Sequence, residues 1–261
     1  MSLDIPAAIE NGLARVPTRV AAILLVLYLV VGALSTVTSS TLGVVITEAI
    51  QGMMPAADPA TPTPTGGGQS PLALEVSLPV AVALFLVQVV IAQAVGVVTI
   101  RSFVSDARQS LPSGVTRRFG WVILNALVAG FVVNVLIGLG TILLIIPGIY
   151  LAVALYFVQF EVIVEDKNAL DALRDGWELT KGERLSVFLL LLVLFAIGLV
   201  SAVPAFALSL MNVSPLAITG ITIVLGAVMG LISVSIAARA YVQLKPDGWS
   251  PPGGGVSPFA H

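Results

Sequence analysis

The side chains with the greatest capacity for chemistry gather in residues 165–184, which read EDKNALDALRDGWELTKGER. Ten of these twenty residues are charged, whereas the whole chain holds only 12 Lys and Arg and 14 Asp and Glu. Charged side chains at this density suit a docking surface or an element that gates a pathway. They also suit a connector that orients the next helix at a membrane surface, and this simpler interpretation is favoured.

Nucleophilic and metal chemistry lacks its usual residues in this sequence. Cysteine is absent, and the single histidine is His261, the last residue. The chain therefore lacks the ligands of most zinc sites and the base of Ser-His-Asp and Cys-His catalytic groups. We expect a protein that is not an enzyme and that holds no metal or cofactor.

Four polar side chains lie inside apolar segments and form a candidate intramembrane polar site: Gln88, Gln93, Asn134 and Glu161. Each amide can hydrogen-bond to a neighbouring helix for about 1 kcal/mol or less, and this structural role is favoured over contact with a solute. Glu161 lies one turn from Glu165, so an interfacial ion pair is favoured over a proton-coupling role. Gln88 and Asn134 lie deepest and are the first choices for lining a polar cavity.

The composition shows which kind of element must position these residues. The chain is 57% hydrophobic and 10% charged, with a mean hydropathy of +1.06, whereas a soluble domain carries about 25% charged residues. This predicts an all-helical, multi-pass integral membrane protein. The second half of the first span, STVTSSTLGVVI, is polar enough to lie near a membrane surface. Six apolar runs are near the length of a transmembrane helix: 20–46, 77–100, 121–141, 147–164, 185–211 and 216–241.

The boundary between the third and fourth spans has two interpretations. Proline is accepted in the first turn of a helix, so Pro147 is best placed at the start of the fourth span. Residues 141–146 would then form a short connector at the outer face. The alternative is a fourth helix that begins at Thr141 and is kinked at Pro147.

Charge determines the predicted orientation. Alternating the sides of six spans puts all 12 Lys and Arg on one side, and Glu48, Asp58 and Glu75 on the other. The positive-inside rule then predicts a protein of the cell membrane with both termini in the cytoplasm. Arg15 and Arg19 precede the first apolar run as in a signal peptide. That run is too long for one and lacks a clear cleavage site, so it is expected to be retained.

The segments outside the spans complete the predicted organisation. Residues 1–19 form a cytoplasmic amphipathic segment, with Ile5, Ile9, Leu13 and Val16 on one helical face. Residues 20–241 form the membrane domain, which includes a Pro-, Thr- and Gly-rich flexible outer loop over 51–76. Residues 242–261 form a flexible cytoplasmic tail.

The charged stretch itself has the periodicity of a helix over 169–181. Asn168 suits an N-cap and Gly182 a stop. We expect this amphipathic helix to lie on the inner leaflet or against the cytoplasmic face of the bundle. Its apolar residues, Leu170, Leu173 and Trp177, are expected to be buried against lipid or against the bundle. Its other face carries the charged residues Asp171, Arg174, Asp175, Glu178 and Lys181. Of these, Asp171, Asp175 and Glu178 are expected not to be buried.

Residues 143–188 resemble the signature of a broad membrane family, which includes the membrane domain attached to some glycerophosphodiester phosphodiesterases and stand-alone bacterial and archaeal relatives. The matching features are Pro147-Gly148 before an apolar helix, VED at 164–166, and AL..GW.LTKG over 169–182. The family often has Ser where this chain has Gly176. The resemblance implies the six-helix membrane fold. It does not imply phosphodiesterase activity, which belongs to a separate soluble barrel, and it transfers no catalytic residue.

Three functions are compatible with the sequence. The favoured one is a non-enzymatic scaffold or regulatory module that acts through its cytoplasmic face, with membrane lipids, a protein partner or a second copy as its partners. The alternative is a transporter or channel for a small or lipidic solute, with Pro147-Gly148 and Pro204 shaping helices around a cavity. An intramembrane enzyme ranks last because no nucleophile–base pair is present. No nucleic-acid partner is expected.

Overall fold

The computed structural model describes residues 3–53, 72–211 and 213–252, and within them every regular element is a helix. The predicted outer loop lies mostly outside the described residues, as does the tail from 253 onward. The helices are α1 (Ile5–Leu13), α2 (Arg19–Met53), α3 (Leu78–Val104), α4 (Phe119–Leu143), α5 (Ile145–Ala154), α6 (Val158–Glu165), α7 (Ala169–Leu179), α8 (Arg184–Leu210) and α9 (Pro215–Leu244).

Six segments of the described chain are long and apolar enough to cross a membrane, which confirms the predicted number of spans. They are α2, α3, α4, α5 together with α6, α8 and α9. Several are longer than predicted. Helix α2 continues to Met53, into the segment predicted as a loop, and α9 continues to Leu244, into the segment predicted as a tail.

The turn between the third and fourth spans differs from both predicted arrangements. Helix α4 continues to Leu143, the extended residue Leu144 turns the chain, and α5 begins at Ile145. The connector is therefore one residue long instead of residues 141–146. Two glycines explain how the helices reverse so tightly, because a Cβ on Gly140 would lie 3.1 Å from the Cα of Gly148.

The fourth span contains a break that the sequence did not predict. Helix α5 ends at Ala154, and α6 begins at Val158. A helix end leaves carbonyl groups without intrahelical partners. The hydroxyl of Thr180, at the end of α7, donates a 3.0 Å hydrogen bond to the carbonyl of Ala154. A residue distant in sequence thus stabilises the break.

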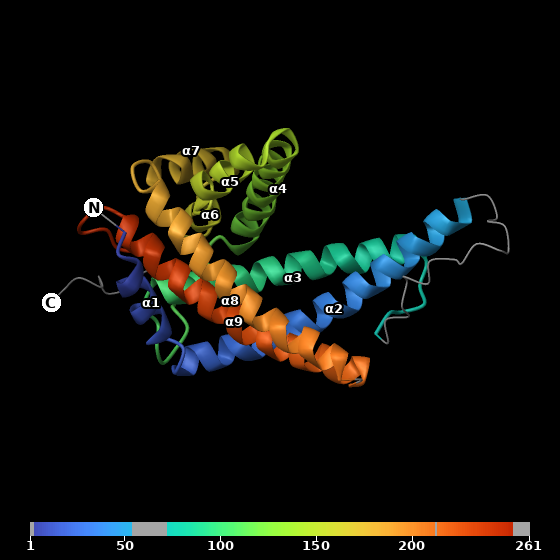
Figure 1. Cartoon of the computed structure of the whole chain (residues 1–261). Coiled ribbons are helices and arrows are strands. Elements are labelled where there is room, and N and C mark those ends of the chain that lie inside the picture. Colours follow the sequence, from blue (N-terminus) through green and yellow to red (C-terminus); the bar gives the residue numbers. More distant parts are fainter. Residues whose placement is uncertain (1–2, 54–71, 212, 253–261) are drawn as a thin grey trace.

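The helices diverge from one packed end of the bundle (Figure 1). Helices α2 and α3 run side by side, α8 lies along α9, and α4 packs against α5. Val20, Leu24, Val97 and Ile236 are fully buried where these pairs meet. We call the packed end of the bundle the charged end, because the Lys and Arg residues flank the helix termini there. Large apolar side chains toward the opposite end are exposed and suit contact with lipid; examples are Phe131, Ile142, Phe206 and Leu210.

Helix α1 packs against α9. Asp4 caps its first turn by accepting a 3.0 Å hydrogen bond from the amide of Ala7. A Cβ on Gly12 would lie 2.8 Å from the side chain of Ile236, and the hydroxyl of Ser235 donates a 2.9 Å hydrogen bond to the Gly12 carbonyl. Ala8 and Gly12 are therefore buried against the bundle, and Ile5 and Ile9 of the predicted apolar face pack beside them half-buried, whereas Leu13 of that face is 46% exposed.

Helix α7 occupies residues 169–179 of the predicted 169–181, and Asn168 accepts the capping hydrogen bond of Asp171 at 3.0 Å. Its buried side faces the bundle through Ala169, Ala172 and Gly176. Leu173 and Trp177 are half-buried against the bundle, whereas Leu170 is 78% exposed, so its burial against lipid stays a prediction. Asp171 and Glu178 are exposed, whereas Asp175 is half-buried because it pairs with Lys167 at 2.7 Å. The position of α7 at a membrane surface stays a prediction.

Gly176 is expected to be intolerant of any side chain. A Cβ there would lie 2.7 Å from the side chain of Val158 and 3.1 Å from its Cα, so backbone must shift. We expect Gly176→Ala to lower the free energy of unfolding by about 1–3 kcal/mol, measured by reversible unfolding in mixed detergent micelles. The control is Gly96→Ala, where nothing lies within 4 Å of the new Cβ. Equal stability of the two variants would contradict the packing described here.

Candidate functional site

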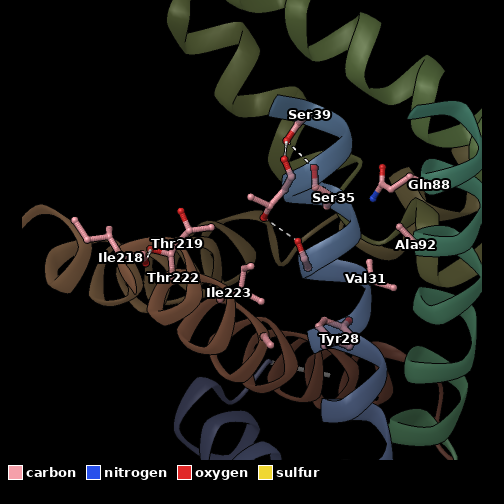
Figure 2. A pocket seen from close by; sticks show the side chains of 14 residues that line it. Tyr28, Val31, Ser35, Ser39, Gln88, Ala92, Ile218, Thr219, Thr222 and Ile223 are labelled. Atoms are coloured by element: carbon pink, nitrogen blue, oxygen red, sulfur yellow. Dashed lines mark hydrogen bonds between the residues drawn. The ribbon is translucent and has the colours of Figure 1, made fainter. Parts of the chain in front are cut away.

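An open cavity of about 530 Å³ lies between α2, α3 and α9, and side chains of these three helices line it (Figure 2). It lies between the diverging pairs α2/α3 and α8/α9, away from the packed charged end. Tyr28 is its lining residue nearest to the charged end on α2, and a Cβ on Gly230 would lie 3.4 Å from the Tyr28 ring. The divergence of the helices therefore creates a cavity whose inner end is packed.

Hydroxyl groups line two walls of this cavity. Thr36 and Ser39 of α2 donate hydrogen bonds of 2.8 and 2.6 Å to the carbonyls of Gly32 and Ser35, and Thr222 of α9 donates one of 2.9 Å to its own helix. These bonds occupy the hydroxyl hydrogens, and the oxygen lone pairs stay available to accept. The two walls can therefore accept hydrogen bonds from a bound molecule.

Gln88 of α3 supplies the third wall. Its side chain lines the cavity and the residue is 6% exposed, yet its amide makes no hydrogen bond with the described residues. The residue as a whole is buried, but its amide nitrogen and oxygen are not among the fully buried polar atoms, so they are accessible from the cavity. The group can both donate and accept, so it is the strongest indication that the cavity holds a polar ligand group.

The other candidate amides lie elsewhere. Gln93 donates a long 3.4 Å hydrogen bond to Gln159 of α6. Asn134 is exposed and donates 2.8 Å to the Gly130 carbonyl of its own helix. The structure thus brings only Gln88, of the four candidates, to the cavity. Five hydroxyl-bearing residues of the cavity lining were not predicted: Ser35, Thr36, Ser39, Thr219 and Thr222. The first three lie in the second half of the first span, whose polar character is visible in the sequence.

Glu161 lies in a separate cluster at the charged end. It is 1% exposed and forms ion pairs with Lys245 at 2.7 Å and Lys167 at 2.6 Å. Tyr241 donates a further 3.1 Å hydrogen bond to it. Both carboxylate oxygens are thereby occupied, and Lys245 also pairs with Glu165 at 3.1 Å. The arrangement is that of a structural ion-pair network joining α6 and α9.

Lys167 and Trp249 extend this network. Burial lowers the pKa of Lys167, but its hydrogen bonds to Asp175 and Glu161 outweigh that effect, so the pKa is raised and the amine stays charged. Trp249, beyond the last helix, donates 2.8 Å to Glu165. The first residues after α9 are therefore packed on the charged end.

Arg101 forms a second buried network. Its Nε donates 2.8 Å to the Ile163 carbonyl, and its Nη1 donates 2.9 and 2.8 Å to the carbonyls of Val115 and Arg117. Its Nη2 pairs with Asp166 at 2.5 Å. Arg117 Nε lies 2.7 Å from the other Asp166 oxygen, an ion pair without hydrogen-bond geometry. One guanidinium thus joins α3, the α3–α4 connection and α6.

Trp177 also has a defined role at this end. The guanidinium of Arg184 lies 4.5 Å from the centre of its ring and 4.7 Å from that of Tyr150, to which Arg184 also donates a hydrogen bond. These contacts are cation–π interactions. They tie α7 to α5 and to the start of α8. Among the described residues, no His, Cys, Asp and Glu side chains group as a metal site.

Comparison with known proteins gives a family and no function. Neither the curated proteins nor the solved structures contain a match to this chain. A family model described as a domain of unknown function, DUF7847, matches residues 3–244, from the residue before the α1 cap to the end of α9. The matched region includes all six apolar segments and the cavity. This multi-pass membrane protein therefore belongs to the DUF7847 family.

Proposed function

We propose that this protein binds a neutral amphipathic molecule, of the lipid class, in the cavity between α2, α3 and α9. The observation that carries the proposal is the amide of Gln88, a residue that is 6% exposed, which faces the cavity without a hydrogen-bond partner among the described residues. A volume of about 530 Å³ is also in the usual range of ligand cavities, about 300–1,000 Å³.

The chemistry of the lining supports a neutral ligand with both polar and apolar parts. Among the described residues, no Asp, Glu, Lys or Arg side chain lines the cavity, so none of them there neutralises an ionic ligand. Hydroxyl oxygens and the Gln88 amide suit hydroxyl or amide groups of the ligand. Val31, Ile218 and Ile223 line the same space and suit an acyl chain.

The packing of the bundle supports binding or carriage over open conduction. Val20, Leu24, Val97 and Ile236 fill the charged end beyond Tyr28. This arrangement suits a lipidic solute that enters from one side. Binding or carriage of such a solute is a form of the transporter function. It does not require enzymatic chemistry, for which the sequence offers no Cys and one terminal His.

A second function is favoured by the surface of α7. Leu170 is 78% exposed beside the exposed charges of Asp171, Arg174 and Glu178. This surface supports the scaffold or regulatory role, with a protein partner, a second copy or membrane lipids bound at the charged end. The positive-inside rule supports a cytoplasmic position for that end and for both termini, in the cell membrane. A relationship to the membrane domain of glycerophosphodiester phosphodiesterases stays a prediction.

Photo-crosslinking with a diazirine-bearing monoacylglycerol tests the cavity. We expect labelled peptides from α2, α3 and α9. We expect Gln88→Leu to weaken labelling about tenfold, since a lost hydrogen bond in a buried site is worth about 1.4 kcal/mol. Gln93→Leu is the matched control, because Gln93 lies on the same helix and does not line the cavity. Equal labelling of the two variants, or labelling at other helices, would overturn the proposal.

A further inference from the structure

Arg239 presents a buried positive charge with no counterion in direct contact. It lies on α9 at the charged end, and it is 5% exposed. Its Nε and Nη2 are buried and have no hydrogen-bond partner among the described residues. None of the ion pairs in the described part of the chain includes Arg239. This site is separate from the cavity between α2, α3 and α9.

The surroundings of Arg239 are positively charged. Ser235, one turn earlier on α9, binds the carbonyl of Gly12, and this contact brings the α9 face beside Arg15. Arg15 pairs with Asp106 at 2.8 Å, and Arg108 approaches the same carboxylate oxygen at 3.5 Å. The charges of all three groups act on Arg239. Two guanidinium groups, those of Arg15 and Arg108, therefore already share the one carboxylate of Asp106.

The existing contacts leave Arg239 without a partner. Arg15 already donates its Nε to Asp106 at 2.9 Å and its Nη1 to the Asn11 carbonyl at 2.5 Å. Burial lowers the pKa of Arg15, and the Asp106 carboxylate opposes this effect. Asp106 thus serves Arg15 and Arg108. An unpaired, buried guanidinium is strongly unfavourable, so a further anion is expected at Arg239.

The two free nitrogens indicate the shape of that anion. Nε and Nη2 lie on the same edge of the planar guanidinium, and this edge matches two oxygens of a phosphate or carboxylate. Inorganic phosphate carries more negative charge than a carboxylate, and the phosphodiester of a lipid headgroup carries the same single charge, so both kinds of phosphate suit the excess positive charge. Arg108 is 57% exposed and is the group that an anion from the surface meets first.

We propose that Arg239 and Arg108 bind a phosphate group at the charged end of the bundle, with Arg15 and Asp106 fixing the position of the site. The phosphate belongs either to the headgroup of an anionic phospholipid or to a soluble phosphate. Basic sites between helix ends suit anionic headgroups, because headgroup phosphates lie at the depth of those ends.

Binding of phosphatidylglycerol and of inorganic phosphate to the full-length protein tests this site. Phosphatidylglycerol binding is measured by native mass spectrometry from detergent, and inorganic phosphate by the rise in unfolding temperature. We expect Arg239→Gln to weaken binding by at least about tenfold, because hydrogen bonds to charged groups contribute about 1.5–3 kcal/mol. Arg174→Gln is the control, since that side chain is 80% exposed on α7 and pairs only with Glu178.

Each result has a defined meaning. Arg239-dependent binding of phosphatidylglycerol alone identifies a lipid headgroup, and Arg239-dependent stabilisation by inorganic phosphate identifies a soluble ligand. Binding of neither probe, or equal binding by both variants, would overturn the proposal. If Arg239→Gln does not fold, Arg108→Gln replaces it, with an expected loss of about two- to fivefold for an exposed contact. An unchanged affinity in that variant would count equally against the site.

Discussion

Replacing Glu161 with glutamine is expected to lower the free energy of unfolding by about 3 kcal/mol, because removing one partner of a buried ion pair leaves uncompensated charge. Glu161 is 1% exposed and binds both Lys245 and Lys167. Such losses reach about 5 kcal/mol, but each lysine keeps a second acidic partner, Glu165 or Asp175, so the lower value is expected.

The measurement is reversible unfolding of the purified protein in mixed detergent micelles. Glu178→Gln is the matched control, because that carboxylate is 60% exposed and its only ion pair is with Arg174 on the same helix. Exposed pairs of this kind contribute about 0–1 kcal/mol. A loss below about 1 kcal/mol for Glu161→Gln would show that the network does not stabilise the charged end as described.

Replacing Arg101 with methionine is expected to have the largest effect on stability, about 4 kcal/mol. The change removes hydrogen bonds to the carbonyls of Ile163, Val115 and Arg117. It also leaves Asp166, whose side chain is 8% exposed, with only the ion pair of Arg117. Methionine fills part of the volume of the arginine side chain, so the loss in the free energy of unfolding comes mainly from the lost polar contacts.

Arg101→Lys separates charge from geometry. Lysine keeps the positive charge, but its ammonium group cannot reach the separate carbonyls that the planar guanidinium joins. We expect it to recover less than half of the stability lost in Arg101→Met, measured under the same unfolding conditions. Full recovery would mean that charge alone, and not the fork of the guanidinium, holds α3 to α6.

The parts of the fold that depend on local sequence were predictable. Six apolar runs predicted six spans because each run must cover its own length of hydrocarbon, whatever its neighbours are. The start of α7 was predictable from Asn168, because the N-cap hydrogen bond joins residues only three positions apart in the sequence. The same reasoning placed α4 only two residues short of its end at Leu143.

The candidate site was predictable only in part. Gln88 was identified because an uncharged polar residue in an apolar run is conspicuous, and it lines the cavity. Gln93 is also an uncharged polar residue in an apolar run, but it does not line the cavity. Serine and threonine within helices are less informative, because their hydroxyls bond to their own helix, as those of Ser39 and Thr222 do. Whether such a residue lines the cavity depends on the direction in which its side chain points, and helix packing sets that direction.

By itself, the sequence determined the membrane class, the number of spans, the capped helix after the fourth span, and the concentration of charge at alternate helix ends. Each of these depends on short-range pattern and on the cost of placing polar backbone in lipid. Only the tertiary structure decided that the fourth span breaks after Ala154, that Glu161 is enclosed by two lysines, and that Arg239 lacks a partner. The first two join residues of different segments, with Thr180 and Ala154 26 positions apart and Lys245 and Glu161 84 positions apart, and the third depends on a partner being absent among the described residues. Their energies come from burial and geometry that a linear pattern does not contain.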